Sequence, residues 1–216
     1  GSRLDPLVIQ VLPFLGIHLQ DSRYHRFGRE EAASREQFQQ DLRDTVSLLY
    51  SVPSLAVWVP FNEGWGQFDS LTAAQLLWDL DPTRLVDHAS GWHDQGGGDF
   101  KSRHVYFRPV RLRHDGSRVL ALTEFGGYSL PVEGRTASAR TFGYRIYKTR
   151  EEFLLELEKL YRREVLPCLN KQGLSAAVYT QLSDVEDEVN GILTYDRKVC
   201  KADVQRLRAI NRELRV

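Results

Sequence analysis

Two glutamates follow apolar runs of the kind that form buried strands, and both lie among aromatic residues and glycines. Glu63 comes just after the run SLAVWVPF at residues 54–61, and Glu124 follows RVLALT at residues 118–123. Such neighbours remove part of the water around a carboxylate and let a backbone approach it closely. Two carboxyl groups at one edge of a sheet can serve as a proton donor and a nucleophile. We therefore predict Glu63 and Glu124 as catalytic residues, although most of the 29 acidic residues must be solvated surface charges.

This pair suits glycoside hydrolysis, in which one acid protonates the leaving oxygen and the other attacks the sugar or activates water. The chain carries 29 basic and 29 acidic residues, so it has no net charge with which to attract a nucleic acid or an anionic membrane. Its apolar runs are far shorter than the roughly 18 to 20 residues that span a bilayer. The expected partner is a neutral carbohydrate substrate, with no nucleic acid and no membrane.

The elements that must position these glutamates alternate between continuous apolar runs and helical spacing, which predicts an α/β chain with a single domain over residues 1–216. Buried strands are expected at residues 6–12, 54–61, 84–89, 103–107, 118–123 and 174–181. Helices are expected after the capping boxes Ser34/Gln37 and Thr149/Glu152, and at residues 69–80 and 202–214. Six parallel strands are two short of a TIM-type (β/α)8 barrel. The alternative, an open doubly wound sheet, lacks its usual glycine-rich fingerprint here.

Five segments in order along the chain resemble glycoside hydrolase family 2, which contains β-galactosidases, β-glucuronidases and β-mannosidases. They are VPFNEGWGQFD, LDPTRLVDHASGW, HVY, TEFGG and NGILTYDRK, at residues 59–69, 80–92, 104–106, 123–127 and 190–198. The resemblance covers nearly the whole chain. It implies the C-terminal part of the catalytic TIM-type barrel, with strands three to eight present, and with strands one and two and the upstream sugar-binding and sandwich domains outside this sequence.

The resemblance also implies a mechanism: a retaining, β-galactosidase-like hydrolysis of terminal β-linked sugars without an organic cofactor. Glu124 would attack the anomeric carbon, while Glu63 would protonate the leaving oxygen and later deprotonate water, with the two carboxyls about 5 to 5.5 Å apart. Asn62 would bond the sugar 2-hydroxyl. The alternative is a carbohydrate-binding or scaffold fragment that keeps the fold without turnover.

Six further residues are candidates for substrate binding: Trp65, Trp92, His104, Tyr106, Tyr179 and Gln181. Tyr106 is placed to hydrogen-bond the nucleophile, and His104 is placed to orient Tyr106 or the nucleophile. Each could instead be a core residue whose polar atoms are hydrogen-bonded within the protein. Trp65 and Trp92 could stack on a sugar or simply cover the core. Tyr179 stands where many family members carry a tryptophan at the floor of the sugar site, which is a departure from the family pattern.

No metal site is expected, because His88, His93, Asp94 and Asp99 match no tetrahedral zinc spacing and their loop has no cysteine. Some family members use a divalent cation, whose ligands cannot be carried over to positions here. Two cysteines without a CxxC pair, and no visible signal segment, favour a cytoplasmic location. Unpaired sheet edges predict association with another copy of the chain or with upstream domains of the same protein.

Overall fold

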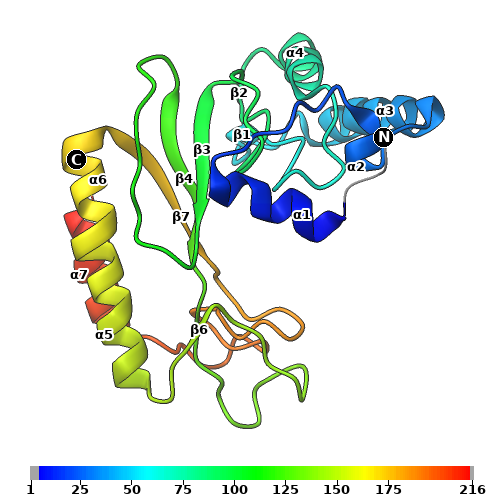
Figure 1. The fold of residues 1–216 in the computed structure, drawn as a ribbon. Helices are drawn as coiled ribbons and strands as arrows, with labels where there is room; N and C mark the ends of the chain where they lie inside the picture. Colours follow the sequence, from blue (N-terminus) through cyan, green and yellow to red (C-terminus); the bar gives the residue numbers. More distant parts are fainter. Residues whose placement is uncertain (1–4, 215–216) are drawn as a thin grey trace. The chain divides into compact units, whose positions relative to one another are not determined.

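The computed structural model describes residues 5–214, which fall into two compact units, and Figure 1 shows their helices and strands. The first unit runs up to Arg103 and includes Asp115–Leu120, and the second comprises His104–His114 and the chain from Ala121 onward. The fold is mixed α/β. Its described strands form three separate sheets, of which two are parallel pairs and the third has the order β3-β4-β7. The single domain and the incomplete barrel stay predictions.

The first described element is a helix where a strand was predicted. α1 spans Pro6–Val11 and continues into the 3-10 turn η1 (Leu12–Leu15). The Asp5 carboxylate accepts the Leu7 backbone N–H at 2.8 Å, and a proline at the helix start has no N–H to leave unsatisfied. A short continuous apolar run fits a strand or a helix equally well, and the Asp-Pro start decides the matter. The strand prediction for residues 6–12 was therefore wrong.

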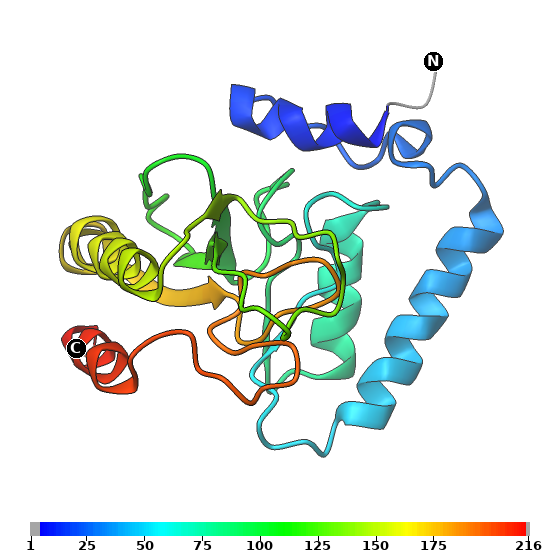
Figure 2. The ribbon, with the colours of Figure 1, turned by 90° about the horizontal axis from the view of Figure 1, so that it is seen from below.

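Three helices follow in the first unit: α2 (Tyr24–Phe27), α3 (Ala32–Leu49) and α4 (Ser70–Leu80). α4 confirms the helix predicted at residues 69–80. α3 begins before the capping box predicted at Ser34, whose hydroxyl instead accepts a hydrogen bond from Arg29 Nη1 at 3.1 Å. Figure 2 shows α3 beside α4. They pack over a core of buried residues: Val46, Trp58, Ala74, Leu77 and Val86.

A parallel pair of strands in the first unit leads to Glu63. β1 (Val57–Trp58) pairs with β2 (Leu85–Val86), and the two segments stay side by side as far as a parallel bridge between Asn62 and Ser90. The Glu63 backbone N–H donates to the Ser90 carbonyl at 2.9 Å. Glu63 therefore lies just beyond the carboxyl end of its strand, although only two of the eight residues predicted for that strand are regular.

Strands also lead to Glu124 in the second unit. β3 (Phe100–Val105) and β4 (Val119–Gly126) enter it from the first unit, and β4 lies between β3 and β7 (Leu174–Thr180). After β4, the short strand β5 (Tyr128–Ser129) pairs in parallel with β6 (Arg145–Ile146). The strands predicted at residues 103–107, 118–123 and 174–181 are confirmed with small shifts of their ends.

The helices of the second unit are α5 (Arg150–Leu160), the π-helix η2 (Tyr161–Val165), α6 (Leu166–Gln172) and α7 (Val204–Glu213). The capping box of Thr149 and Glu152 is confirmed at the start of α5. α7 lies alongside α5 in both views (Figures 1 and 2), where Arg206 Nε donates to Glu158 Oε1 at 2.7 Å. No helix in the described part of the chain has the length and apolarity to cross a membrane.

Candidate functional site

Glu124 lies near the end of β4 with its side chain 30% exposed, so a ligand can reach a carboxylate that the protein also holds. The Tyr106 hydroxyl donates a short hydrogen bond to Glu124 Oε2, and His104 Nδ1 lies 3.3 Å from the same oxygen. Thr180 Oγ1 is 3.2 Å from the Tyr106 oxygen. Because the phenol proton is directed to the carboxylate, the Thr180 hydroxyl is the donor in this second contact.

The proton of Tyr106 is held firmly. Burial, followed by the nearby negative charge of Glu124, raises the pKa of Tyr106 far above its ordinary value. The phenol is thus a permanent donor to Glu124 across the physiological pH range. The ring of Tyr144 stacks on that of Tyr106 with centroids 4.1 Å apart and an interplanar angle of 5°. The structure therefore brings His104 and Tyr106 to Glu124, as the sequence suggested, and adds Tyr144, which no sequence motif indicated.

Tyr179 packs beneath the end of β4. Its half-buried ring meets Phe125 edge-on at a centroid distance of 5.7 Å. A Cβ on Gly126, whose φ is +92°, would lie 2.3 Å from the Tyr179 ring, so only glycine allows this approach. Burial raises the pKa of Tyr179 well above its ordinary value. These contacts give Tyr179 a packing role against Phe125 and Gly126 at the end of β4, and its part in binding a sugar stays a prediction.

Gln181 follows β7 and belongs to a polar cluster. Its Nε2 donates to Glu188 Oε2 at 2.9 Å and to Asn190 Oδ1 at 2.7 Å. Asn190 Nδ2 donates to the same Glu188 oxygen at 3.2 Å. Sequence reasoning singled out Gln181 but not Glu188. The motif NGILTYDRK, which begins at Asn190, also pointed to this segment.

Glu63 lies in a tight turn of the first unit. Its φ is +52° and that of Gly64 is +72°. A Cβ on Gly64 would come within 2.6 Å of His93 Cδ2, so glycine lets the turn rest directly on that imidazole. The Trp65 N–H donates to the Asn62 carbonyl at 3.0 Å and closes the turn. Both Asn62 and Trp65 are exposed, which leaves them accessible to a ligand.

His93 ties this turn to the N-terminal elements. Its ring is fully buried, its Nδ1 accepts the Leu19 N–H at 3.1 Å, and its Nε2 lies 2.9 Å from the Ile9 carbonyl. Since Nδ1 accepts, Nε2 carries the proton and donates to Ile9 in α1. The preceding residue, Trp92, is only 8% exposed. Of the two tryptophans predicted to stack on a sugar, only Trp65 is therefore exposed to a ligand.

The first unit should become less stable at acidic pH. Burial lowers the pKa of His93, as it does that of His18, whose ring is 6.5 Å away, while the hydrogen bond to the Ile9 carbonyl and, to a smaller extent, the charge of Asp21 oppose the shift at His93. Between the lowered value and about 6.5, the unfolded chain binds protons that the folded chain does not, so the free energy of unfolding should decrease as the pH drops below about 6.5. Urea unfolding at several pH values measures this dependence.

The matched variants are His93→Gln, which cannot gain a charge, and His114→Gln at an exposed histidine. We expect a flatter pH dependence for His93→Gln and an unchanged one for His114→Gln. Equal pH dependence in His93→Gln and the wild type would show that His93 is not the group that titrates.

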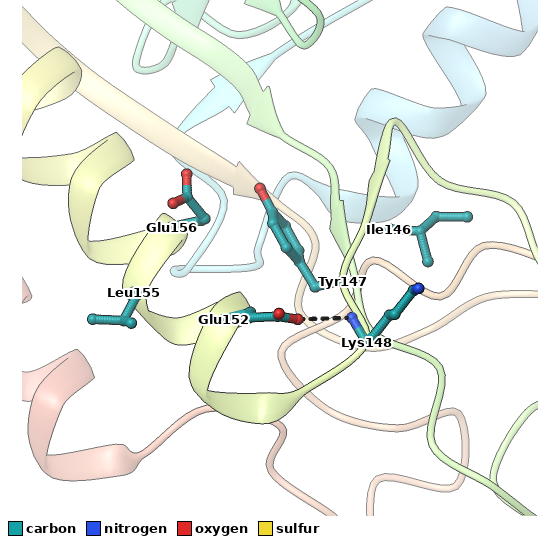
Figure 3. Close-up of a pocket in the computed structure, with 6 residues that line it drawn as sticks. All are labelled: Ile146, Tyr147, Lys148, Glu152, Leu155 and Glu156. Carbon is teal, nitrogen blue, oxygen red and sulfur yellow. Dashed lines mark hydrogen bonds between the residues drawn. The ribbon is translucent and has the colours of Figure 1, made fainter.

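A pocket at the start of α5 has a volume of about 490 Å³ and is lined by Ile146, Tyr147, Lys148, Glu152, Leu155 and Glu156 (Figure 3). The Lys148 backbone N–H donates to Glu152 Oε2 at 3.3 Å, and this glutamate also closes the capping box of α5. Helix capping accounts for Glu152 here. None of the predicted catalytic or substrate-binding residues lines this pocket, so it is not the candidate site.

Comparisons with known proteins give a likeness of fold. No protein-family model and no curated protein sequence matches the chain. Faecalibacterium prausnitzii β-glucuronidase matches with a TM-score of 0.55 and 14% identity, over 82% of this chain and 34% of that chain. The FMN-binding β-glucuronidase of Faecalibacterium prausnitzii L2-6 matches with a TM-score of 0.55 and 15% identity, over 80% and 31%. The chain thus spans about a third of the length of either protein and shares the fold of that part.

Proposed function

We propose that this chain is the C-terminal part of a (β/α)8 catalytic barrel of a family 2 glycoside hydrolase. The reaction is the retaining cleavage of terminal β-linked sugars, in the manner of β-galactosidases. One observation carries the proposal: a partly exposed carboxylate, Glu124, that Tyr106 and His104 hold at the end of a strand. The likeness in fold to part of two β-glucuronidases supports a glycosidase over other uses of two carboxyl groups.

Glu124 acts as the nucleophile in this mechanism. Its oxygen forms a bond to the anomeric carbon as the bond to the leaving oxygen breaks, and Glu63 gives its proton to that oxygen. Water then attacks the glycosyl-enzyme, Glu63 takes the proton of that water, and Glu124 leaves as a carboxylate. The hydrogen bond from Tyr106 favours the ionised form of Glu124 and fixes its orientation before each attack.

Trapping of the covalent intermediate tests the proposal. In a 2,4-dinitrophenyl 2-deoxy-2-fluoro-β-glycoside, the fluorine slows both the formation and the hydrolysis of the glycosyl-enzyme. The good leaving group lets the formation step proceed, so the glycosyl-enzyme accumulates. We expect peptide mass spectrometry to find one fluorosugar on Glu124 for at least one of the galactoside, glucoside, mannoside and glucuronide reagents. Glu124→Gln is the unlabelled control. Sugar binding without any adduct would favour the carbohydrate-binding alternative, and an adduct on another carboxylate would overturn the assignment of Glu124.

Tyr106→Phe should lower kcat/KM by about 10- to 100-fold, since a hydrogen bond to a charged group contributes about 1.5 to 3 kcal/mol. Loss of this donor also disfavours the ionised form of Glu124, so the acidic limb of the pH profile should move to higher pH. Nitrophenyl glycoside hydrolysis across pH measures both effects. Tyr195→Phe, at an exposed tyrosine, is the matched control. An acidic limb that stays in place would contradict the role given to Tyr106.

A further inference from the structure

The cluster of Gln181, Glu188 and Asn190 presents a carboxylate that is fixed on one side only. Both amides donate to Glu188 Oε2, at 2.9 and 3.2 Å. Within the described residues, no protein group bonds Glu188 Oε1. Asn190 is fully buried, while Glu188 and Gln181 are half-buried. The cluster is therefore a preorganised acceptor whose second oxygen remains available to a donor from solution.

Backbone contacts place this cluster next to the residues that hold Glu124. Gln181 directly follows Thr180, whose hydroxyl contacts Tyr106 at 3.2 Å. Glu188 pairs with Phe142 in a parallel bridge, with the Phe142 N–H donating to the Asp187 carbonyl at 2.7 Å.

Aromatic rings complete the connection on the other side. The Phe142 ring meets Tyr144 edge-on at 5.6 Å, and Tyr144 stacks on Tyr106. The contacts thus form a closed circuit within the second unit: Tyr106, Tyr144, Phe142, Glu188, Gln181 and Thr180. Because Tyr106 is also the donor to Glu124, these contacts link Glu188 to the residues that hold Glu124.

We propose that Glu188, oriented by Gln181 and Asn190, is a specificity-determining residue that accepts hydrogen bonds from the hydroxyls of a neutral sugar held at Glu124. The inference rests on the proposed function. A half-buried carboxylate accepts strongly from hydroxyl groups, and it repels a sugar that carries its own carboxylate. The substrate is therefore a neutral β-glycoside, in contrast to the glucuronide indicated by the names of the two structural neighbours.

Glu188→Gln tests this inference, because it removes the charge and keeps the size and one acceptor oxygen. The matched control is Glu186→Gln, which removes the same charge from an exposed glutamate of the same loop. The wild type should prefer neutral nitrophenyl β-glycosides to the β-glucuronide. Glu188→Gln should lower kcat/KM for the preferred neutral substrate by about 10- to 100-fold, the range expected for a lost charged hydrogen bond. The value of kcat/KM for the glucuronide should not decrease. The ratio of kcat/KM for the neutral substrate to that for the glucuronide should therefore decrease by at least about tenfold in Glu188→Gln and should not change in Glu186→Gln.

The melting temperature separates this role from a purely structural one. If the cluster only held the loop, Glu188→Gln would lower stability and the rates for all substrates together, and the ratio would not change. An unchanged ratio, or a wild type that prefers the glucuronide, overturns the inference while the hydrolase proposal stands.

Calorimetric titration with galactose, glucose, mannose and glucuronate distinguishes failure of the inference from failure of the proposed function. If the chain binds neutral sugars through Glu188 but never forms a covalent adduct, the proposed hydrolase activity is rejected and the sugar-binding role of Glu188 is kept. A chain that neither binds nor hydrolyses any of these sugars would reject both.

Discussion

Glu124→Ala should lower the turnover of a β-glycoside by about 10⁴-fold or more, because the covalent step loses its nucleophile. Glu63→Ala should depend on the leaving group. Alkyl glycosides need a proton on the departing oxygen and should lose about 10² to 10⁴-fold, while 2,4-dinitrophenyl glycosides should lose far less in the first step. Steady-state rates with the two kinds of substrate measure the difference. Glu133→Ala, at an exposed glutamate, is the control and should retain full activity.

Azide should identify the role of each glutamate from the product it forms. In Glu63→Ala, azide replaces the activated water on the glycosyl-enzyme and should give a β-glycosyl azide. In Glu124→Ala, azide replaces the nucleophile and should give the α-azide. Proton NMR of the products distinguishes the two anomers. Exchanged anomers would mean that Glu63 is the nucleophile and Glu124 the acid, and the restraint of Glu124 by Tyr106 would then need another explanation.

The surroundings of Glu124 were largely predictable because they are built on regular strands. His104 and Tyr106 are two residues apart at the end of β3 and just beyond it, and side chains at that spacing point to the same face of a strand. Both side chains contact Glu124 Oε2, so the motif HVY indicated two neighbours of this carboxylate. Which face it used could not be read from the motif alone, since core packing places the same residue types in the same pattern.

The loop residues were harder to predict because their positions depend on contacts distant in sequence. Glu188 is held by two amides and a backbone bridge to Phe142, 46 positions earlier in the chain, and no local pattern encodes that bridge. Glu63 adopts a positive φ that propensity assigns to glycine. Its neighbour Gly64 marks the turn, but the imidazole beneath it comes from His93, in a loop that the sequence left without structure.

A buried ion pair stabilises the polar segment after β7, and we expect its removal to cause the largest decrease in the free energy of unfolding. Lys201 and Asp184 are 1% and 4% exposed, and Lys201 Nζ donates to Asp184 Oδ1 at 2.6 Å. Lys201 also donates to the Val189 carbonyl at 2.9 Å, and the Gly191 N–H donates to Asp184 Oδ1 at 2.8 Å. The pair thus fixes the backbone on either side of Asn190, and with it the cluster around Glu188.

Lys201→Met should lower the free energy of unfolding by about 3 to 5 kcal/mol, because it leaves the buried Asp184 carboxylate without its counter-ion. Lys198→Met, at an exposed lysine three residues earlier, should change it by less than about 0.5 kcal/mol. Adding Asp184→Asn to Lys201→Met removes the stranded charge and keeps an acceptor for Gly191, so part of the loss should return. Urea unfolding measures all three. A Lys201→Met protein as stable as the wild type would show that the pair is unimportant to the fold. If the segment loosens as expected, that variant should raise KM for neutral glycosides more than it lowers kcat, because the residues disturbed lie around Glu188 and not at Glu124.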